Sequence, residues 1–138
     1  MRLCLTCQVP LIKRHKIKFC SVVCQKAHQY EQYIFAWKKG DMDGNIGITA
    51  RSISGYLRKY LMIKYAGKCS ECGWDKKHPL TGNAPLEIEH IDGNAENNKE
   101  ENLTLLCPNC HSLSLHYKNL NRGNGRKWRM EKYIKNSS

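Results

Sequence analysis

The sequence lacks a hydrophobic run of about 18 residues, the length that a membrane-spanning helix needs. Its first stretch, MRLCLTCQVPLIKRHK, also lacks the continuous apolar segment of a secretory signal peptide, because cysteine, proline and basic residues interrupt it. Acidic residues are few: 12 Asp and Glu stand against 23 Lys and Arg, which gives a formal net charge of +11. We therefore expect a basic intracellular protein.

Cysteine, by contrast, is abundant, with eight residues in a chain of 138. Thiols stay reduced inside cells, so these cysteines need a use other than disulfides. They fall into two sets by spacing: Cys4, Cys7, Cys20 and Cys24, then Cys69, Cys72, Cys107 and Cys110. A C-x-x-C turn can place two thiolates on one metal, and tetrahedral zinc takes four ligands. The pattern predicts two structural zinc ions that compensate for a small core, with free or disulfide-bonded cysteines as the alternative.

The chain divides, by its glycines and its hydrophobic periodicity, into four predicted segments. They are a zinc knuckle with a helix (1–39), a glycine-rich linker (40–47), a second domain (48–126) and a basic tail (127–138). In the first segment, Ser21 is suited to cap a helix that Gly40 ends. The second domain should begin with a helix over 48–67 and continue with strands at 86–91 and 102–107 and a helix over 110–120. This order predicts a small, zinc-stabilised α+β protein.

One window, LEIEHIDGNAENNKEENLTLLCPNCH (86–111), gathers four polar residues that are poor core material: Glu89, His90, Asn102 and His111. Taken singly, each has an ordinary interpretation as a buried histidine, a turn residue or a neighbour of zinc. Together they indicate a site. Adjacent residues of a strand point to opposite sides, so Glu89 and His90 can serve different partners. We expect one of them to hold a metal and the other to handle a water molecule.

The pieces CSECG, EHIDGNAENN and ENLTLLCPNCHS occur in an order that resembles the HNH endonuclease family of phages and bacteria. The resemblance covers roughly residues 55–126. It implies a ββα-metal nuclease unit with a four-cysteine structural zinc, double-stranded DNA as the partner, and the host cytoplasm as the location if a phage encodes the protein. The expected activity is metal-dependent hydrolysis of DNA phosphodiester bonds.

The resemblance also implies a role for each residue of the window. His90 would be the general base that takes a proton from the attacking water, and Asn102 would fix the orientation of its imidazole. Glu89 and His111 would hold one divalent cation, Mg²⁺ or Mn²⁺, which binds a phosphate oxygen and the departing 3′ oxygen. Relatives with a third protein ligand have histidine four residues beyond the position of His111, whereas this chain has His116, one residue out of register.

Basic residues outside this window are candidate DNA contacts. In the C-terminal stretch they are Lys118, Arg122, Arg126, Lys127 and Arg129. The alternative is a solvated tail. The same two interpretations apply to the basic residues of the helix predicted at 48–67, among them Arg58.

Two other classes of protein compete with the nuclease. A non-catalytic, zinc-dependent nucleic-acid-binding protein would explain the knuckles and the charge, but not Glu89, His90 and Asn102. The second class is a zinc deaminase, because the HID and CPNC pieces resemble its motif. However, Asp92 stands where a deaminase requires glutamate, and no proline precedes Cys107.

Overall fold

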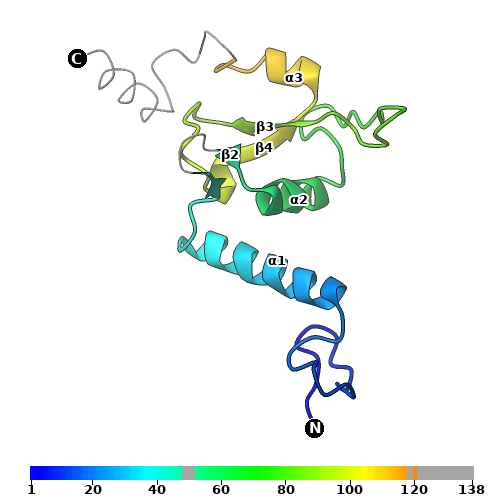
Figure 1. Ribbon diagram of the computed structural model, residues 1–138. Coiled ribbons are helices and arrows are strands. Elements are labelled where there is room, and N and C mark those ends of the chain that lie inside the picture. The colour runs from blue at the N-terminus through cyan, green and yellow to red at the C-terminus, as the bar shows by residue number, and fades with distance from the viewer. Residues whose placement is uncertain (48–51, 118–119, 121–138) are drawn as a thin grey trace, which may run out of the picture. The chain divides into compact units, whose positions relative to one another are not determined.

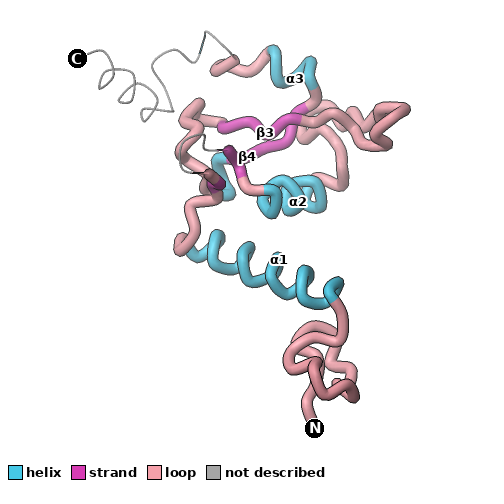
Figure 2. Tube along the Cα trace, viewed as in Figure 1, coloured by secondary structure: helices cyan, strands magenta, loops and turns pink. Residues whose placement is uncertain are grey.

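The computed structural model describes residues 1–47, 52–117 and 120. It is a small α+β protein, as predicted, with short helices and two antiparallel two-stranded sheets (Figures 1 and 2). The helices are α1 (Val22–Lys39), α2 (Gly55–Lys64), the 3₁₀ turn η1 (Glu100–Asn102) and α3 (Pro108–Ser112), and the strands are β1 (Asn45–Ile46), β2 (Ser52–Ile53), β3 (Glu87–His90) and β4 (Leu103–Leu106). The chain separates into two compact units, Met1–Met42 and Asp43–Ser138.

None of the described helices has the length and the apolar character that would let it cross a membrane.

The first unit is a cysteine-bearing loop that leads into α1. A tight turn closes the loop: Cys4 donates its N–H to Val9 at 2.9 Å and accepts from Gln8 at 3.0 Å. Helix α1 begins as predicted, because the Ser21 side chain accepts from the Cys24 N–H at 3.2 Å. It ends as predicted at Gly40, whose φ of 93° is the left-handed conformation that glycine adopts at low cost.

The segment predicted as a linker, residues 40–47, contains the two residues of β1. This strand pairs antiparallel with β2 so that Asn45 faces Ile53. This pairing also shortens the predicted helix at 48–67, of which residues 48–51 lie outside the described residues. Helix α2 begins at Gly55, where the Ser54 side chain accepts from the Tyr56 N–H at 3.1 Å. A serine cap and a strand partner together set this start.

The hydrophobic core cluster of the second unit is centred on the β3–β4 hairpin and the segments beside it, and Met62 of α2 packs against it. Its members are Cys69, Ala84, Leu86, Leu105, Leu106 and Cys107. Leu57 and Leu61 of α2 are also fully buried. The Arg58 side chain donates to the Leu86 carbonyl at 2.8 Å, so this charge supports the start of β3. Figure 1 shows α2 on one side of the hairpin and α3 on the other.

The hairpin register follows the predicted strands closely. Glu87 pairs with Leu106, Glu89 with Thr104, and His90 with Leu103. Because side chains alternate along a strand, Glu87 and Glu89 share one side and His90 takes the other. The chain then turns at Cys107 directly into α3, so the hairpin positions this short helix.

A test of the packing between β1 and α2 is available at Gly44. It has a φ of 77°, and an added Cβ would lie 2.5 Å from Leu57 Cδ1. We expect Gly44→Ala to lower the free energy of unfolding by about 2–4 kcal/mol, from the left-handed backbone and from overpacking.

The matched control is Gly82→Ala, which has a φ of 70° but no atom within 4 Å of the added Cβ. It should lose only about 1–2 kcal/mol. Denaturant unfolding of the metal-loaded protein measures both, and equal losses would contradict the packing described here.

Candidate active site

The cysteines gather into the two predicted groups. In the first unit, Cys4, Cys7, Cys20 and Cys24 place their sulfur atoms within 4.8 Å of one another. The Cys20 sulfur lies 3.6 Å from that of Cys7 and 3.5 Å from that of Cys24. Four sulfurs at about 2.3 Å from a zinc ion are roughly 3.8 Å apart, so this group could hold zinc.

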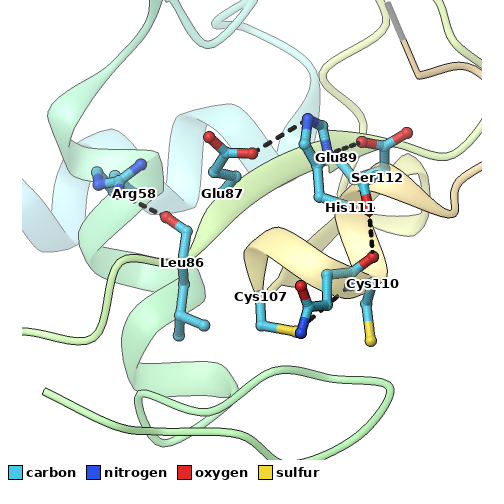
Figure 3. Close-up of polar contacts among 9 residues, drawn as sticks. Arg58, Leu86, Glu87, Glu89, Cys107, Cys110, His111 and Ser112 are labelled. Atoms are coloured by element: carbon cyan, nitrogen blue, oxygen red, sulfur yellow. Dashed lines mark hydrogen bonds and ion pairs between the residues drawn. The ribbon is translucent and has the colours of Figure 1, made fainter.

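The second group joins the knuckle at Cys69 and Cys72 to the start of α3 at Cys107 and Cys110. Here the Cys72 and Cys107 sulfurs are 3.7 Å apart. Cys107 is also the N-cap of α3, because its sulfur accepts from the Cys110 N–H at 3.4 Å. One of the four sulfurs that could bind zinc, that of Cys107, therefore also caps the start of α3 (Figure 3).

The protonation of these thiols favours a cation in each group. Burial acts to raise the pKa of Cys69, but the backbone N–H groups of Cys72 and Cys107 outweigh it and lower that pKa to about 6. Side-chain hydrogen bonds with Cys107 and then Cys72 raise the pKa of Cys110, because they favour its protonated thiol, and repulsion from a Cys107 thiolate adds to the rise. In the first group the Cys7 N–H leads the lowering of the Cys4 pKa to about 6. A divalent cation offsets this repulsion, so the donor sets fit zinc.

The structure brings Glu89 and His111 together. Glu89 Oε2 lies 2.6 Å from His111 Nδ1, which is buried and has no partner with hydrogen-bond geometry among the described residues (Figure 3). Glu89 is itself 8% exposed. Glu89 and His111 therefore bring a carboxylate oxygen and a ring nitrogen to one point, which is a donor pair that a shared cation could use.

Glu87 is a further residue of this cluster, and it was missed in the sequence. Its Oε2 atom lies 3.1 Å from Nε2 of His111, on the opposite edge of the imidazole from Glu89. The Tyr117 ring meets the same imidazole edge-on, with centroids 5.2 Å apart. A carboxylate on the second nitrogen of a metal-binding histidine commonly fixes its orientation and tautomer. Strand alternation was the available signal, because Glu87 precedes Glu89 by two positions.

His90 points away from that pair, as the alternation of β3 requires. Its Nε2 atom lies 2.7 Å from Oδ1 of Asn98. Asn98 is 4% exposed and was not among the predicted site residues. No local sequence signal marks it, because its other partners come from a segment more than 50 positions earlier in the chain.

Asn102 makes different contacts from those expected. Its Nδ2 donates to Asp92 Oδ1 at 2.9 Å and to the Asn97 carbonyl at 2.8 Å, and its Oδ1 accepts from the Asp92 N–H at 3.0 Å. These bonds hold the loop between β3 and η1. The side-chain contact to the His90 imidazole comes from Asn98 instead. The Asn102 backbone carbonyl accepts at 2.9 Å from the N–H of Ile91, the residue that follows His90.

Other predicted residues stay without a structural account. The candidate DNA contacts Lys118, Arg122, Arg126, Lys127 and Arg129 lie outside the described residues. His116 is described, and its Nδ1 is buried with no hydrogen-bond partner in the described part of the chain.

Comparison with known families identifies the class of this site. Residues 69–114, which contain the second cysteine group and the β3–β4–α3 elements, match the family model of the HNH endonucleases. This match confirms, for residues 69–114, the resemblance to the HNH endonucleases predicted from the sequence.

A relative carries the same domain. The chain is 53% identical over 47 residues to the H-N-H endonuclease F-TflIV of Escherichia phage T5. The match covers 34% of this chain and 20% of that protein, so the chain spans about one fifth of the length of this relative. No solved structure matches the chain.

The loop that Asn102 holds provides a test. The Asn97 side chain, the Asn94 N–H and the Asn102 side chain all donate to Asp92 and lower its pKa below the ordinary 3.8. Since the folded pKa is depressed, the stabilisation is present above pH 3.8 and is lost only as pH falls through the folded pKa. Asp92→Asn should cost about 1 kcal/mol of loop stability, discounted for exposure.

Amide hydrogen exchange measures this cost as a fall of roughly fivefold in the protection of the Asn94 N–H. The fall should be the same at about pH 6 and about pH 8, because Asp92 is ionised at both. If the fall in protection disappears or grows between about pH 6 and about pH 8, an ionised Asp92 is not the acceptor that holds this loop.

Proposed function

We propose that this chain is a metal-dependent endonuclease that hydrolyses phosphodiester bonds of double-stranded DNA and leaves 5′-phosphate and 3′-hydroxyl ends. The observation that carries the proposal is the close approach of Glu89 Oε2 to His111 Nδ1, 2.6 Å without a hydrogen bond, inside an HNH domain. His90 directly follows Glu89 on the same strand, which supplies a base beside a cation site. We further propose that β3, β4 and α3 form the ββα-metal unit of the family.

Glu89 and His111 are the residues that would hold the catalytic cation, Mg²⁺ or Mn²⁺. Glu89 supplies a carboxylate of the kind that Mg²⁺ and Mn²⁺ bind, with water in the remaining positions, and His111 supplies one imidazole nitrogen. Glu87 would orient the imidazole of His111 from its other edge, at 3.1 Å. When bound, the cation supplies positive charge that stabilises the phosphate and the departing 3′ oxygen.

His90 is the proposed general base. It accepts one proton from a water molecule as the water oxygen forms a bond to phosphorus, and the bond from phosphorus to the 3′ oxygen breaks. The 3′ oxygen leaves with the electron pair and takes up a proton from solvent water to become a hydroxyl, while His90 returns its proton to solvent. An imidazole suits this role near neutral pH because its ordinary pKa is about 6.5.

The two cysteine groups are proposed to hold two structural zinc ions with separate tasks. The second group holds α3, and therefore His111, against the hairpin. The first group shapes the N-terminal unit, which lies outside the HNH match and is proposed as an accessory module.

Contact with DNA is proposed to draw on the net charge of +11. Lys118, Arg122, Arg126, Lys127 and Arg129 are the proposed phosphate contacts. The competing function, a non-catalytic nucleic-acid-binding protein, predicts binding without cleavage.

The decisive test is a plasmid-nicking assay on wild type and His90→Ala. We expect cleavage with Mg²⁺ or Mn²⁺, and a fall of about 10²–10⁴-fold in the variant, the usual contribution of a positioned base. DNA affinity should stay unchanged, because neither cysteine group nor the Glu89–His111 pair is altered. Brief EDTA treatment should stop wild-type cutting before zinc is lost, and added Mg²⁺ should restore it.

A wild-type protein that binds DNA but never cuts it would support the non-catalytic alternative. Cutting by His90→Ala at the wild-type rate would remove His90 from the mechanism.

The separate tasks of the cysteine groups give a second prediction. Wild type should contain about two zinc ions per chain, and Cys7→Ser and Cys72→Ser should each lose about one. Both cysteines are exposed, so the two variants are matched. Only Cys72→Ser should lose nicking activity, because only its group holds α3.

Metal analysis and the nicking assay measure the two properties in the same samples. Equal activity in Cys72→Ser and Cys7→Ser would contradict the proposed support of His111 by the second group.

A further inference from the structure

Asn98 connects the proposed base to a part of the chain outside the HNH match. Its Oδ1 atom lies 2.7 Å from Nε2 of His90. Its Nδ2 atom donates to the Asp43 carbonyl at 3.0 Å and to Asn45 Oδ1 at 2.9 Å. Asp43 and Asn45 precede the matched segment, which begins at residue 69.

These partners fix which way the Asn98 amide points. A backbone carbonyl can only accept a hydrogen bond, so the atom that faces Asp43 must be the NH₂ group. The oxygen therefore faces His90. Because an amide oxygen can only accept, the Nε2 atom of His90 must carry a proton to bond with it. In the neutral imidazole the lone pair is then on Nδ1.

The segment around Asn45 leaves Asn98 little freedom to turn. Asn98 is 4% exposed, and a Cβ added at Gly44 would lie 3.2 Å from the Asn98 Cβ. The Asp43 side chain accepts from the Asn45 N–H at 2.9 Å, and the Gly44 carbonyl accepts from the Ser54 N–H at 2.8 Å. The β1–β2 ribbon therefore forms a fixed frame against which Asn98 is held.

We propose that Asn98 is a positioning residue of the nuclease: held by Asp43 and Asn45, it fixes the His90 imidazole with its proton on Nε2 and presents Nδ1 as the nitrogen that takes the proton from water. This inference rests on the proposed function. It assigns a task to the β1–β2 ribbon, which the family match does not include. It also assigns to Asn98 the orienting contact that the sequence suggested for Asn102.

The test compares Asn98→Ala with Asn94→Ala in the nicking assay. Asn94 lies in the same loop, and its side chain accepts only from the Glu96 N–H among its described contacts, at 3.0 Å. We expect Asn98→Ala to lower kcat by roughly 10–100-fold, with KM and DNA affinity within about twofold of wild type, because a misplaced base slows chemistry and not binding. Asn94→Ala should cut like wild type.

A third variant covers the case in which Asn98→Ala fails to fold. Asn45→Ala removes one of the two acceptors that hold Asn98 and leaves the Asp43 carbonyl, so kcat should fall by a few-fold only. Zinc content and helical circular dichroism identify any variant that has lost its structure. Wild-type kcat in folded Asn98→Ala would overturn the proposal.

A second readout does not depend on cleavage. Proton–nitrogen NMR correlation of the imidazole rings is recorded at about pH 8, where an ordinary imidazole is neutral. In wild type it should show a slowly exchanging proton on Nε2 of His90. His90→Gln assigns the signal by its disappearance, and Asn98→Ala should lose it to fast exchange.

A His90 proton found on Nδ1 would overturn the proposal even if the enzyme is active. If wild type does not cut DNA at all, the proposed function fails, while the ring proton still reports separately on the contact to Asn98.

Discussion

The arrangement of the site depends on one constraint, the placement of α3 by the second cysteine group. Helix α3 has only five residues, and a helix of that length is not stable alone. Cys107 caps it, Cys110 follows one turn later, and both belong to the cluster that also includes the knuckle at Cys69 and Cys72. His111 comes directly after Cys110, so the cluster places its backbone beside β3, where Glu87 and Glu89 contact its imidazole.

The hairpin then divides the chemistry between its two sides. Alternation along β3 directs Glu87 and Glu89 toward α3 and His90 away from it. On one side, Glu87 and Glu89 lie on opposite edges of the His111 imidazole, at 3.1 and 2.6 Å. On the other side, Asn98 bonds to the His90 imidazole at 2.7 Å. A single strand thus separates the proposed cation ligands from the proposed base while keeping them adjacent in sequence.

The sequence predicted those features that local patterns determine. Cysteine spacing predicted both clusters, and the cap at Ser21 and the glycine at Gly40 predicted the ends of α1. The start of α2 was placed too early, because periodicity cannot show that Ile53 pairs with Asn45 in a strand. Asn98 was missed for a related reason: its partner Asn45 is 53 positions away, and only the folded chain brings them together. Glu87, by contrast, could have been found, since it shares a strand face with Glu89.

The central claim is that Glu89 and His111 bind one cation while His90 does not. Pulsed electron paramagnetic resonance of Mn²⁺ added to the zinc-loaded protein tests it directly, because a coordinated imidazole nitrogen couples to the manganese electron spin. We predict nitrogen coupling from one imidazole in wild type, its loss in His111→Gln, and its retention in His90→Gln. Coupling that survives His111→Gln, or that is absent from wild type with Mn²⁺ bound, would contradict the account.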